Sequence, residues 1–341
     1  MSKRIKGNIM LFLTALIWGT AFVAQSTGMD YVGPFTYNGV RNMIAAIVLI
    51  PIIRVFDQMK RNSSLSPVSL KADADGKESL EGNAFPTASL ISANRLSLRY
   101  GAACGIFLFI ASSLQQCGIS MTTAGKAGFI TALYIIIVPV LGIFLKKKIS
   151  PVIWLCVVIA IIGFYLLCIK EGFSISTGDL LVLCCAFFFS LHILVIDHFN
   201  RGTVDGVRMS QAQFLTVAIL SVPFILLQEM PPMEISYSAP HLLQTNVWAA
   251  LLQNIWSARL PILYAAVMSS GVAYTLQILG QRYTDPTTAT LLMSLESVFA
   301  ALSGWLILHE HLSIRELAGC TLVFAAVLMA QLAPDQSASR S

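Results

Sequence analysis

Long apolar stretches separated by short polar segments dominate the chain from one end to the other. A helix needs about 20 mostly apolar residues to cross a lipid bilayer. Judged by that length, the pattern predicts ten membrane-spanning helices and therefore an all-α membrane protein. The predicted spans are residues 8–28, 33–53, 99–121, 124–145, 151–169, 178–198, 207–228, 260–281, 286–308 and 314–332.

The distribution of basic residues predicts how these spans are oriented. Lys and Arg in short loops gather on the cytoplasmic side of a membrane. If the N-terminus is placed inside, most of the 22 Lys and Arg residues fall on the inside. The outside ends then hold only Lys126, Lys170, Arg259 and Arg315. We therefore expect both termini to be cytoplasmic.

Two connections between the predicted spans are long. Residues 54–98 mix Ser, Asp, Gly, Lys and Pro without apolar periodicity, which is typical of a flexible cytosolic loop. Residues 229–259 are expected outside. In them an apolar residue recurs every fourth position from Leu243 to Ile255, which predicts a short amphipathic helix. That helix either lies on the outer leaflet or caps the neighbouring spans, and the sequence leaves both alternatives open.

The second half of the chain repeats the first at a nearly constant offset. The matches are Gly7 with Gly178 and Ala15 with Ala186 (171 positions), Pro51 with Pro223 (172), Gln115 with Gln277 and Gly118 with Gly280 (162), and Ser150 with Ser313 (163). Each unit holds five predicted spans, and because five is odd the second unit must enter the membrane inverted. Such halves enclose a site near the midplane and open it alternately to either side, which indicates a carrier.

The repeat divides the chain into two five-helix units, residues 1–170 and 171–333, followed by a cytosolic tail, residues 334–341. The motifs in these units resemble the EamA family of the drug/metabolite transporter superfamily. They are Trp18-Gly19, Val138-Pro139, Ser270-Gly-Val-Ala-Tyr-Thr-Leu-Gln-Ile-Leu-Gly280, Ser294-Leu-Glu-Ser-Val-Phe-Ala-Ala-Leu302 and Glu310-His-Leu-Ser313. The resemblance implies ten helices, a bacterial inner membrane and export of small metabolites. The first-unit counterpart of Glu310 is Lys147, so that acidic residue is missing from one half.

The composition excludes several other classes of protein. Charged residues make up 11% of the chain and hydrophobic residues 56%, with a mean hydropathy of +0.74. A soluble domain carries about 25% charged residues, so a soluble enzyme and a nucleic-acid binder are not expected. The seven cysteines form no CxxC pair, and there is no GxxxxGK[ST] phosphate loop. We therefore expect no metal and no cofactor.

Polar residues inside the apolar spans are the candidate site. A charge at mid-bilayer costs about 2.5–3.5 kcal/mol, so Glu296 must be paired, hydrated or protonated. It is either a proton or substrate site, or a structural residue that caps broken backbone or pairs with Arg41. Arg41 either contacts a substrate carboxylate, which a guanidinium suits, or extends its side chain to the membrane surface. Glu296 is the candidate proton-coupling residue. Tyr37 and Asn38 share a helix face with Arg41, Ser112 and Gln115 match Tyr274 and Gln277 in the repeat, and Trp18, Tyr134 and Tyr274 could stack on a cyclic substrate. The predicted substrate-binding residues are Trp18, Tyr37, Asn38, Arg41, Ser112, Gln115, Tyr134, Tyr274 and Gln277.

These observations favour a secondary active transporter that exports small metabolites, such as amino acids, across the plasma membrane. Its predicted partners are a small-molecule substrate and the lipid bilayer, and a homodimer stays open. The alternative is an intramembrane enzyme acting on lipid-linked substrates, but such an enzyme would need an acidic cluster such as DDxxD, which is absent. A purely structural bundle would leave the polar residues in the spans unexplained.

Overall fold

The computed structural model describes residues 3–64, 71–72, 78–79, 87–122, 124–146, 149–168, 176–200, 204–229, 240–307 and 313–332. Helices make up almost all of this part of the chain. They are α1 (Lys3–Met29), α2 (Pro34–Ser64), α3 (Thr87–Ile119), α4 (Ala124–Thr131), α5 (Tyr134–Phe144), α6 (Pro151–Cys168), α7 (Thr177–Phe199), α8 (Gly206–Phe224), η1 (Ile225–Glu229), α9 (Pro240–Ser257), α10 (Arg259–Tyr264), η2 (Ala265–Tyr274), α11 (Thr275–Gln281), α12 (Pro286–Met293), α13 (Glu296–Ile307) and α14 (Ile314–Leu332). The stretches η1 and η2 are π-helical.

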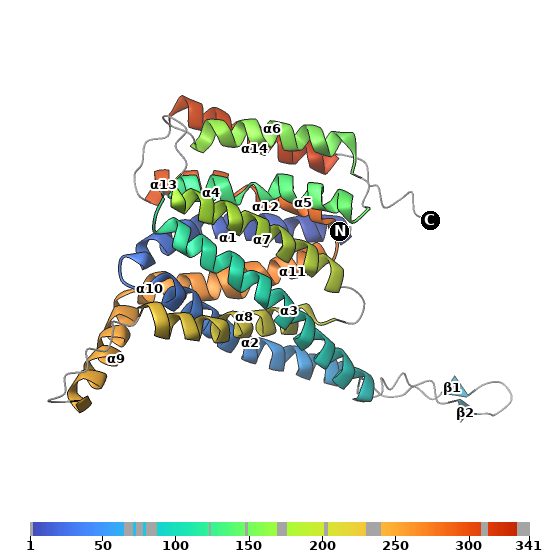
Figure 1. Ribbon diagram of the computed structural model, residues 1–341. Coiled ribbons are helices and arrows are strands. Elements are labelled where there is room, and N and C mark those ends of the chain that lie inside the picture. The colour runs from blue at the N-terminus through green and yellow to red at the C-terminus, as the bar shows by residue number, and fades with distance from the viewer. Residues whose placement is uncertain are drawn as a thin grey trace.

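Two strands of two residues each, β1 (Lys71–Ala72) and β2 (Glu78–Ser79), pair antiparallel between α2 and α3, with Lys71 opposite Ser79. They lie apart from the helical bundle (Figure 1). The fold is therefore all-α, as the sequence predicts.

Within the described residues, each of the ten predicted spans is mostly helical. In this part of the chain, seven segments are long and apolar enough to cross a membrane. They are Lys3–Met29, Pro34–Met59, Ala93–Ile119, Ala127–Phe144, Thr177–Phe199, Gly206–Gln228 and Arg259–Gln281. A shorter apolar helix covers Pro151–Leu166. The all-α, multi-pass character is confirmed, whereas the count of ten spans stays a prediction.

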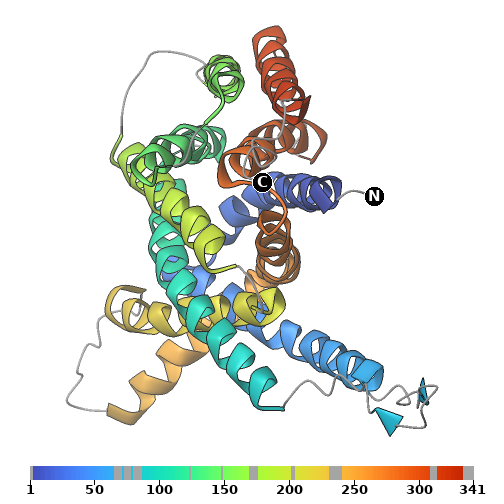
Figure 2. The same ribbon diagram turned by 90° about the vertical axis from the view of Figure 1, so that its right-hand side faces the viewer.

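The helices form a bundle with a separate outer layer. Helices α6 and α14 lie side by side and cover one face of the bundle, while α2, α3 and α8 lie at the opposite face (Figures 1 and 2). Helix α1 begins on the same side of the bundle as α14 ends (Figure 1). We call this end of the bundle the amino-terminal side. The other end of the bundle, where α1 ends, is called the opposite side.

Local sequence signals fix where several helices begin. At α7, the Ser176 hydroxyl accepts the Asp179 backbone N–H, and the Asp179 carboxylate accepts the Ser176 N–H. Ser313 and Glu316 form the same reciprocal pair before α14. Asp285 caps α12, which has Pro286 in its first turn. Such capping satisfies backbone donors that have no partner within the helix.

Two helix crossings reproduce the internal repeat in space. A Cβ built on Gly7 would lie 2.9 Å from the carbonyl oxygen of Gly280, which joins α1 to α11. A Cβ built on Gly178 would lie 3.1 Å from the carbonyl oxygen of Gly118, which joins α7 to α3. These four glycines are the repeat partners matched in the sequence. Both crossings therefore depend on glycine because the backbones approach closely.

Two of the predicted spans contain an irregular turn. In residues 124–145 and 286–308 the helix has a break, at residues 132–133 and 294–295. Tighter backbone bonds from residue i+3 to residue i occur at both breaks, including Ile135 N–H to Ala132 O (3.0 Å) and Ser297 N–H to Ser294 O (3.2 Å). The breaks lie at matching places, because Tyr134 and Glu296, the first residues after them, are 162 positions apart.

The two long connections also contain more helix than expected. Helix α2 continues past the predicted end at 53 to Ser64, and α3 begins at Thr87 instead of 99. The helix predicted within residues 229–259 is present as α9, which projects away from the bundle on the opposite side (Figure 1). Its Trp248 and Trp256 are exposed. Lys147 and Glu310 lie outside the described residues.

The α3–α7 crossing generates a stability prediction. In Gly118→Ala the new Cβ would lie 2.4 Å from Val182 Cγ2 and 2.9 Å from the backbone oxygen of Gly178, which cannot rotate away. Overpacking of this kind costs about 1–3 kcal/mol, so we expect a lower Tm in detergent. Gly128→Ala is the matched control because its nearest neighbour, Phe22 Cζ, is 3.8 Å away. Equal Tm values for the two variants would contradict the crossing.

Candidate functional site

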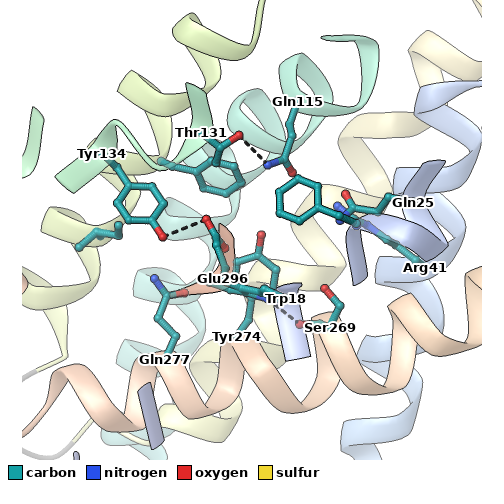
Figure 3. A pocket seen from close by; sticks show the side chains of 13 residues that line it. Trp18, Gln25, Arg41, Gln115, Thr131, Tyr134, Ser269, Tyr274, Gln277 and Glu296 are labelled. Atoms are coloured by element: carbon teal, nitrogen blue, oxygen red, sulfur yellow. Dashed lines mark hydrogen bonds between the residues drawn. The ribbon is translucent and has the colours of Figure 1, made fainter. Parts of the chain in front are cut away.

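One pocket lies between the two repeats, at the level of the helix breaks (Figure 3). Its cavity is small, about 30 Å³, which is room for one or two water molecules. A metabolite would therefore need the surrounding side chains to move apart. The lining residues are Trp18, Phe22, Gln25, Arg41, Gln115, Thr131, Tyr134, Phe189, Ile193, Ser269, Tyr274, Gln277 and Glu296.

Glu296 lies at the start of α13, directly after the break, and its side chain points into the pocket. The Tyr134 hydroxyl donates a hydrogen bond of 2.9 Å to its carboxyl group (Figure 3). Tyr134 is the first residue of α5, at the matching place in the other repeat. The Ser297 hydroxyl also donates to Gly128 O in α4 (3.3 Å). The two broken helices are therefore joined by polar contacts between the repeats.

Arg41 enters the pocket from α2 and is buried. Asn38 Oδ1, one helical turn earlier, accepts hydrogen bonds from its Nε (3.3 Å) and Nη2 (3.1 Å). The guanidinium carbon lies 5.6 Å from the centre of the Tyr37 ring. Among the described residues, no ion pair joins Arg41 to Glu296. The pairing of these two charges that the sequence left open is thus absent from this structure.

Asn38 and Tyr37 stand behind Arg41 rather than in the pocket. The Asn38 amide donates to the hydroxyl oxygens of Ser112 (2.8 Å) and Ser113 (3.2 Å) on α3. Tyr37 donates to Pro261 O (3.3 Å). The hydrogen bonds to Ser112 and Ser113 fix the Asn38 amide, and Asn38 Oδ1 in turn orients the Arg41 guanidinium. A buried side chain that is bonded on several sides has few other rotamers.

An aromatic wall faces the charged groups. The Trp18 and Tyr274 rings are 4.7 Å apart between centroids, and Trp18 Nε1 donates to Ser269 O (3.3 Å). The Thr14 hydroxyl donates to Ala273 O (3.1 Å). Both carbonyls belong to η2, and π-helical turns are frequent at functional sites. Helix α1 thereby satisfies backbone acceptors in the irregular stretch that carries Tyr274 into the pocket.

Repeat partners supply much of the lining. Four pairs contribute both members: Trp18 with Phe189, Phe22 with Ile193, Gln115 with Gln277, and Tyr134 with Glu296. Gln115 Nε2 also donates to the Thr131 hydroxyl (3.2 Å). The pocket is therefore lined by residues from both sequence repeats.

The structure brings together most of the residues that the sequence selects. Seven of them line the pocket: Trp18, Arg41, Gln115, Tyr134, Tyr274, Gln277 and Glu296. Tyr37, Asn38 and Ser112 do not. Sequence reasoning missed Phe22, Gln25, Thr131, Phe189, Ile193 and Ser269. For Phe189 the repeat offered a signal, because Phe189 is the partner of Trp18. Whether these residues bind a substrate stays a prediction.

The described residues contain no group of three or more His, Cys, Asp or Glu side chains placed to hold a metal ion. The polar lining consists instead of amides, hydroxyls, one guanidinium and one carboxyl group. Such groups bind and orient a polar solute by hydrogen bonds and charge.

Comparison with known proteins matches this fold to one family. The model of the EamA-like transporter family matches residues 5–169 and again residues 176–331. The chain belongs to this family. An EamA-like transporter is a multi-pass membrane protein, and the family is one of transporters rather than enzymes.

Relatives of this EamA-like transporter carry transporter names. An uncharacterized transporter of Archaeoglobus fulgidus is 28% identical over 97% of this chain and 87% of its own length. The uncharacterized transporter YoaV of Bacillus subtilis is 22% identical over 95% of this chain and 96% of its own length. A crystal structure with 16% identity covers 96% of this chain and 97% of its own, with a TM-score of 0.66, and is similar in fold.

The separation of the two charges in this EamA-like transporter generates a charge-swap prediction. Because Asn38 holds Arg41 while Tyr134 holds Glu296, exchanging the charges leaves both in unsuitable surroundings. We expect Arg41→Glu/Glu296→Arg to be no more active or stable than either single variant, measured by transport and Tm. Full rescue by the swap would show that the two residues function as an ion pair. Arg41→Lys should keep the fold and weaken apparent substrate affinity, because Lys cannot form two parallel bonds.

Proposed function

We propose that this protein is a secondary active transporter that exports small carboxylate-bearing metabolites, such as amino acids, by alternating access. The main observation that supports this function is that Arg41 and Glu296 line one buried pocket between the repeats without pairing with each other. A buried guanidinium and a buried carboxyl group, each held by a neutral partner, are costly in a membrane unless they act on something else. A substrate carboxylate at Arg41 and a proton at Glu296 would neutralise both.

The donors left on Arg41 support a carboxylate ligand. Asn38 accepts from Nε and Nη2 on one side of the guanidinium, so Nη1 and the second Nη2 proton are available to the pocket. Trp18 and Tyr274 offer flat apolar surface beside the charge. Gln115 and Gln277 add amide groups that can both donate and accept. The pocket therefore suits a solute that carries one carboxylate and further polar groups.

The arrangement in the membrane follows from the repeat and the basic residues. We infer ten spans in two inverted units, residues 1–170 and 171–333, and a cytoplasmic location for both termini in a bacterial plasma membrane. The two separate matches of the family model support the division. Because α1 begins on the same side as α14 ends (Figure 1), the amino-terminal side is the cytoplasmic side in this proposal. A homodimer stays a prediction.

Transport itself is tested in proteoliposomes. Uptake of a panel of amino acids and related carboxylates would be measured with and without an imposed pH gradient. We expect a subset to be transported, faster with the gradient. The variant Glu296→Gln keeps the size and hydrogen-bonding capacity of the side chain but has no titratable proton. Its transport should no longer respond to the gradient. A normal gradient response in this variant would make Glu296 structural and place coupling elsewhere.

The topology is tested by labelling. Single cysteines at Lys147 and Gln244, in a background without the native cysteines, would be exposed to an impermeant maleimide on intact cells. We expect labelling at 244 and none at 147, because basic loops stay inside. The reverse pattern would place both termini outside.

A further inference from the structure

The pocket does not reach equally toward the two sides of the bundle. Five lining residues have a repeat partner that does not line it. They are Gln25, Arg41, Thr131, Ser269 and Tyr274, and their partners are Ile196, Gln213, Met293, Phe107 and Ser112. Gln25 lies one turn before the end of α1, so the pocket extends toward the opposite side. Its partner Ile196 lies toward the amino-terminal side, where the lining stops.

A cluster of buried apolar side chains lies on the amino-terminal side. Its members come from α3, α7, α8, α11 and the segment before α8, and each is at most 2% exposed. They are Cys104, Ile196, Val204, Met209 and Ile278. Two hydrogen bonds from side chain to backbone tie α7 to α11 around this cluster. Asn200 Nδ2 donates to Ile278 O, and Gln281 Nε2 donates to Ile193 O (3.1 Å).

Two of these five cluster residues have repeat partners of the opposite chemistry. Where the amino-terminal side has Ile196 and Ile278, the opposite side has Gln25 and Gln116. Where the amino-terminal side has the tying residues Asn200 and Gln281, the opposite side has Met29 and Ile119. The opposite side therefore has neither the apolar pair nor the two side chains that tie the helices.

Gln25 and Gln116 are buried, yet their amides are not fully bonded. Oε1 of Gln25 and both Oε1 and Nε2 of Gln116 have no hydrogen-bond partner among the described residues, and the same holds for Asn200 Oδ1 and Gln281 Oε1 on the amino-terminal side. Buried polar atoms normally find partners, since leaving one unpaired is costly. In inverted repeats, exchange of the two conformations brings the partners of a closed cluster together. The unpaired amides of Gln25 and Gln116 lie at the positions that such an exchange would bring into contact.

We propose that the transport path has two gates, one formed by Ile196 and Ile278 on the amino-terminal side and one formed by Gln25 and Gln116 on the opposite side. When the Ile196–Ile278 gate opens, Gln25 and Gln116 bond to each other and close over the pocket. This proposal rests on the alternating access proposed above. One gate is then an apolar seal tied by Asn200 and Gln281, and the other is a pair of amides. A solute passing the amide gate meets groups that can bond its carboxylate, whereas the apolar gate must take up water before it can open.

The test measures cysteine crosslinking in the full-length protein, reconstituted in liposomes and without its seven native cysteines. The pair Gln25→Cys/Gln116→Cys reports the amide gate, and Ile196→Cys/Ile278→Cys reports the apolar gate. A protease site is inserted into the chain between the two cysteines. After cleavage, a crosslinked protein still migrates as one full-length band on a denaturing gel, whereas an uncrosslinked protein separates into two fragments. The control pair Ser26→Cys/Ser120→Cys uses neighbouring residues that are exposed and should stay uncrosslinked throughout.

We expect fast crosslinking of the Ile196–Ile278 pair and slow crosslinking of the Gln25–Gln116 pair. Adding Asn200→Ala/Gln281→Ala removes two hydrogen bonds from the closed gate. This change should speed crosslinking of the amide pair by roughly tenfold and slow that of the apolar pair. If that variant does not fold, Ile196→Gln/Ile278→Gln replaces it for the amide pair, and the same acceleration is expected.

An amide pair that crosslinks at the same slow rate in all variants, or as fast as the apolar pair from the start, would overturn the gate assignment. Crosslinking needs no substrate, so it is independent of the uptake measurement. Reciprocal crosslinking without uptake of any solute would leave the gates standing and contradict the proposed transport. Uptake without reciprocal crosslinking would contradict the gates alone.

Discussion

The need to bury the interrupted backbone beside the pocket shapes this molecule. In lipid an unpaired N–H or C=O has no water to bond, so irregular backbone is tolerated only where protein or a cavity surrounds it. Both helix breaks lie inside the bundle, where Tyr134 and Glu296 bond to each other. The π-helical stretch η2 is likewise covered by Thr14 and Trp18. In contrast, the outer helices α6 and α14 are unbroken. The site lies where it does because only the interior can hold such breaks.

The two ionisable side chains of the pocket are held by separate neutral partners. Each is satisfied locally, Arg41 by Asn38 and Glu296 by Tyr134. A direct ion pair would neutralise both, but it would also remove the guanidinium donors from the pocket. Holding each charge with a neutral side chain keeps both groups available at a cost in stability, which is typical of functional rather than structural charges in membranes.

Much of this arrangement could be predicted from the sequence, because its signals are long and repeated. Apolar length located the helices, and the residues of α14 agree with the predicted 314–332. The sequence repeat matches Gly118 with Gly280, and in the structure each of these glycines lies at an equivalent helix crossing. Seven of the candidate residues line one pocket because polar side chains in apolar spans must point inward.

The remaining features carry weak signals in the sequence. Neither break contains Pro or Gly, so hydropathy reads straight through residues 132–133 and 294–295. Helix α2 continues to Ser64 because polar residues also form helix outside the bilayer, where apolar length gives no information. Asn38 was expected in the pocket because it shares a helix face with Arg41. Its amide instead bonds to Ser112 and Ser113, and a helix face alone does not distinguish a lining residue from one behind it.

Duplication alone would produce two equivalent halves and two equivalent gates. Differences between the repeats make the two conformations unequal in free energy, because a side chain present in one half and absent from the other favours one of them. Arg41 lines the pocket, whereas its repeat partner Gln213 lies outside it and accepts a hydrogen bond from His192. Ile196 and Ile278 pack in a closed cluster while their partners retain unpaired amide atoms. The two halves therefore share a backbone design and differ in the side chains at these positions.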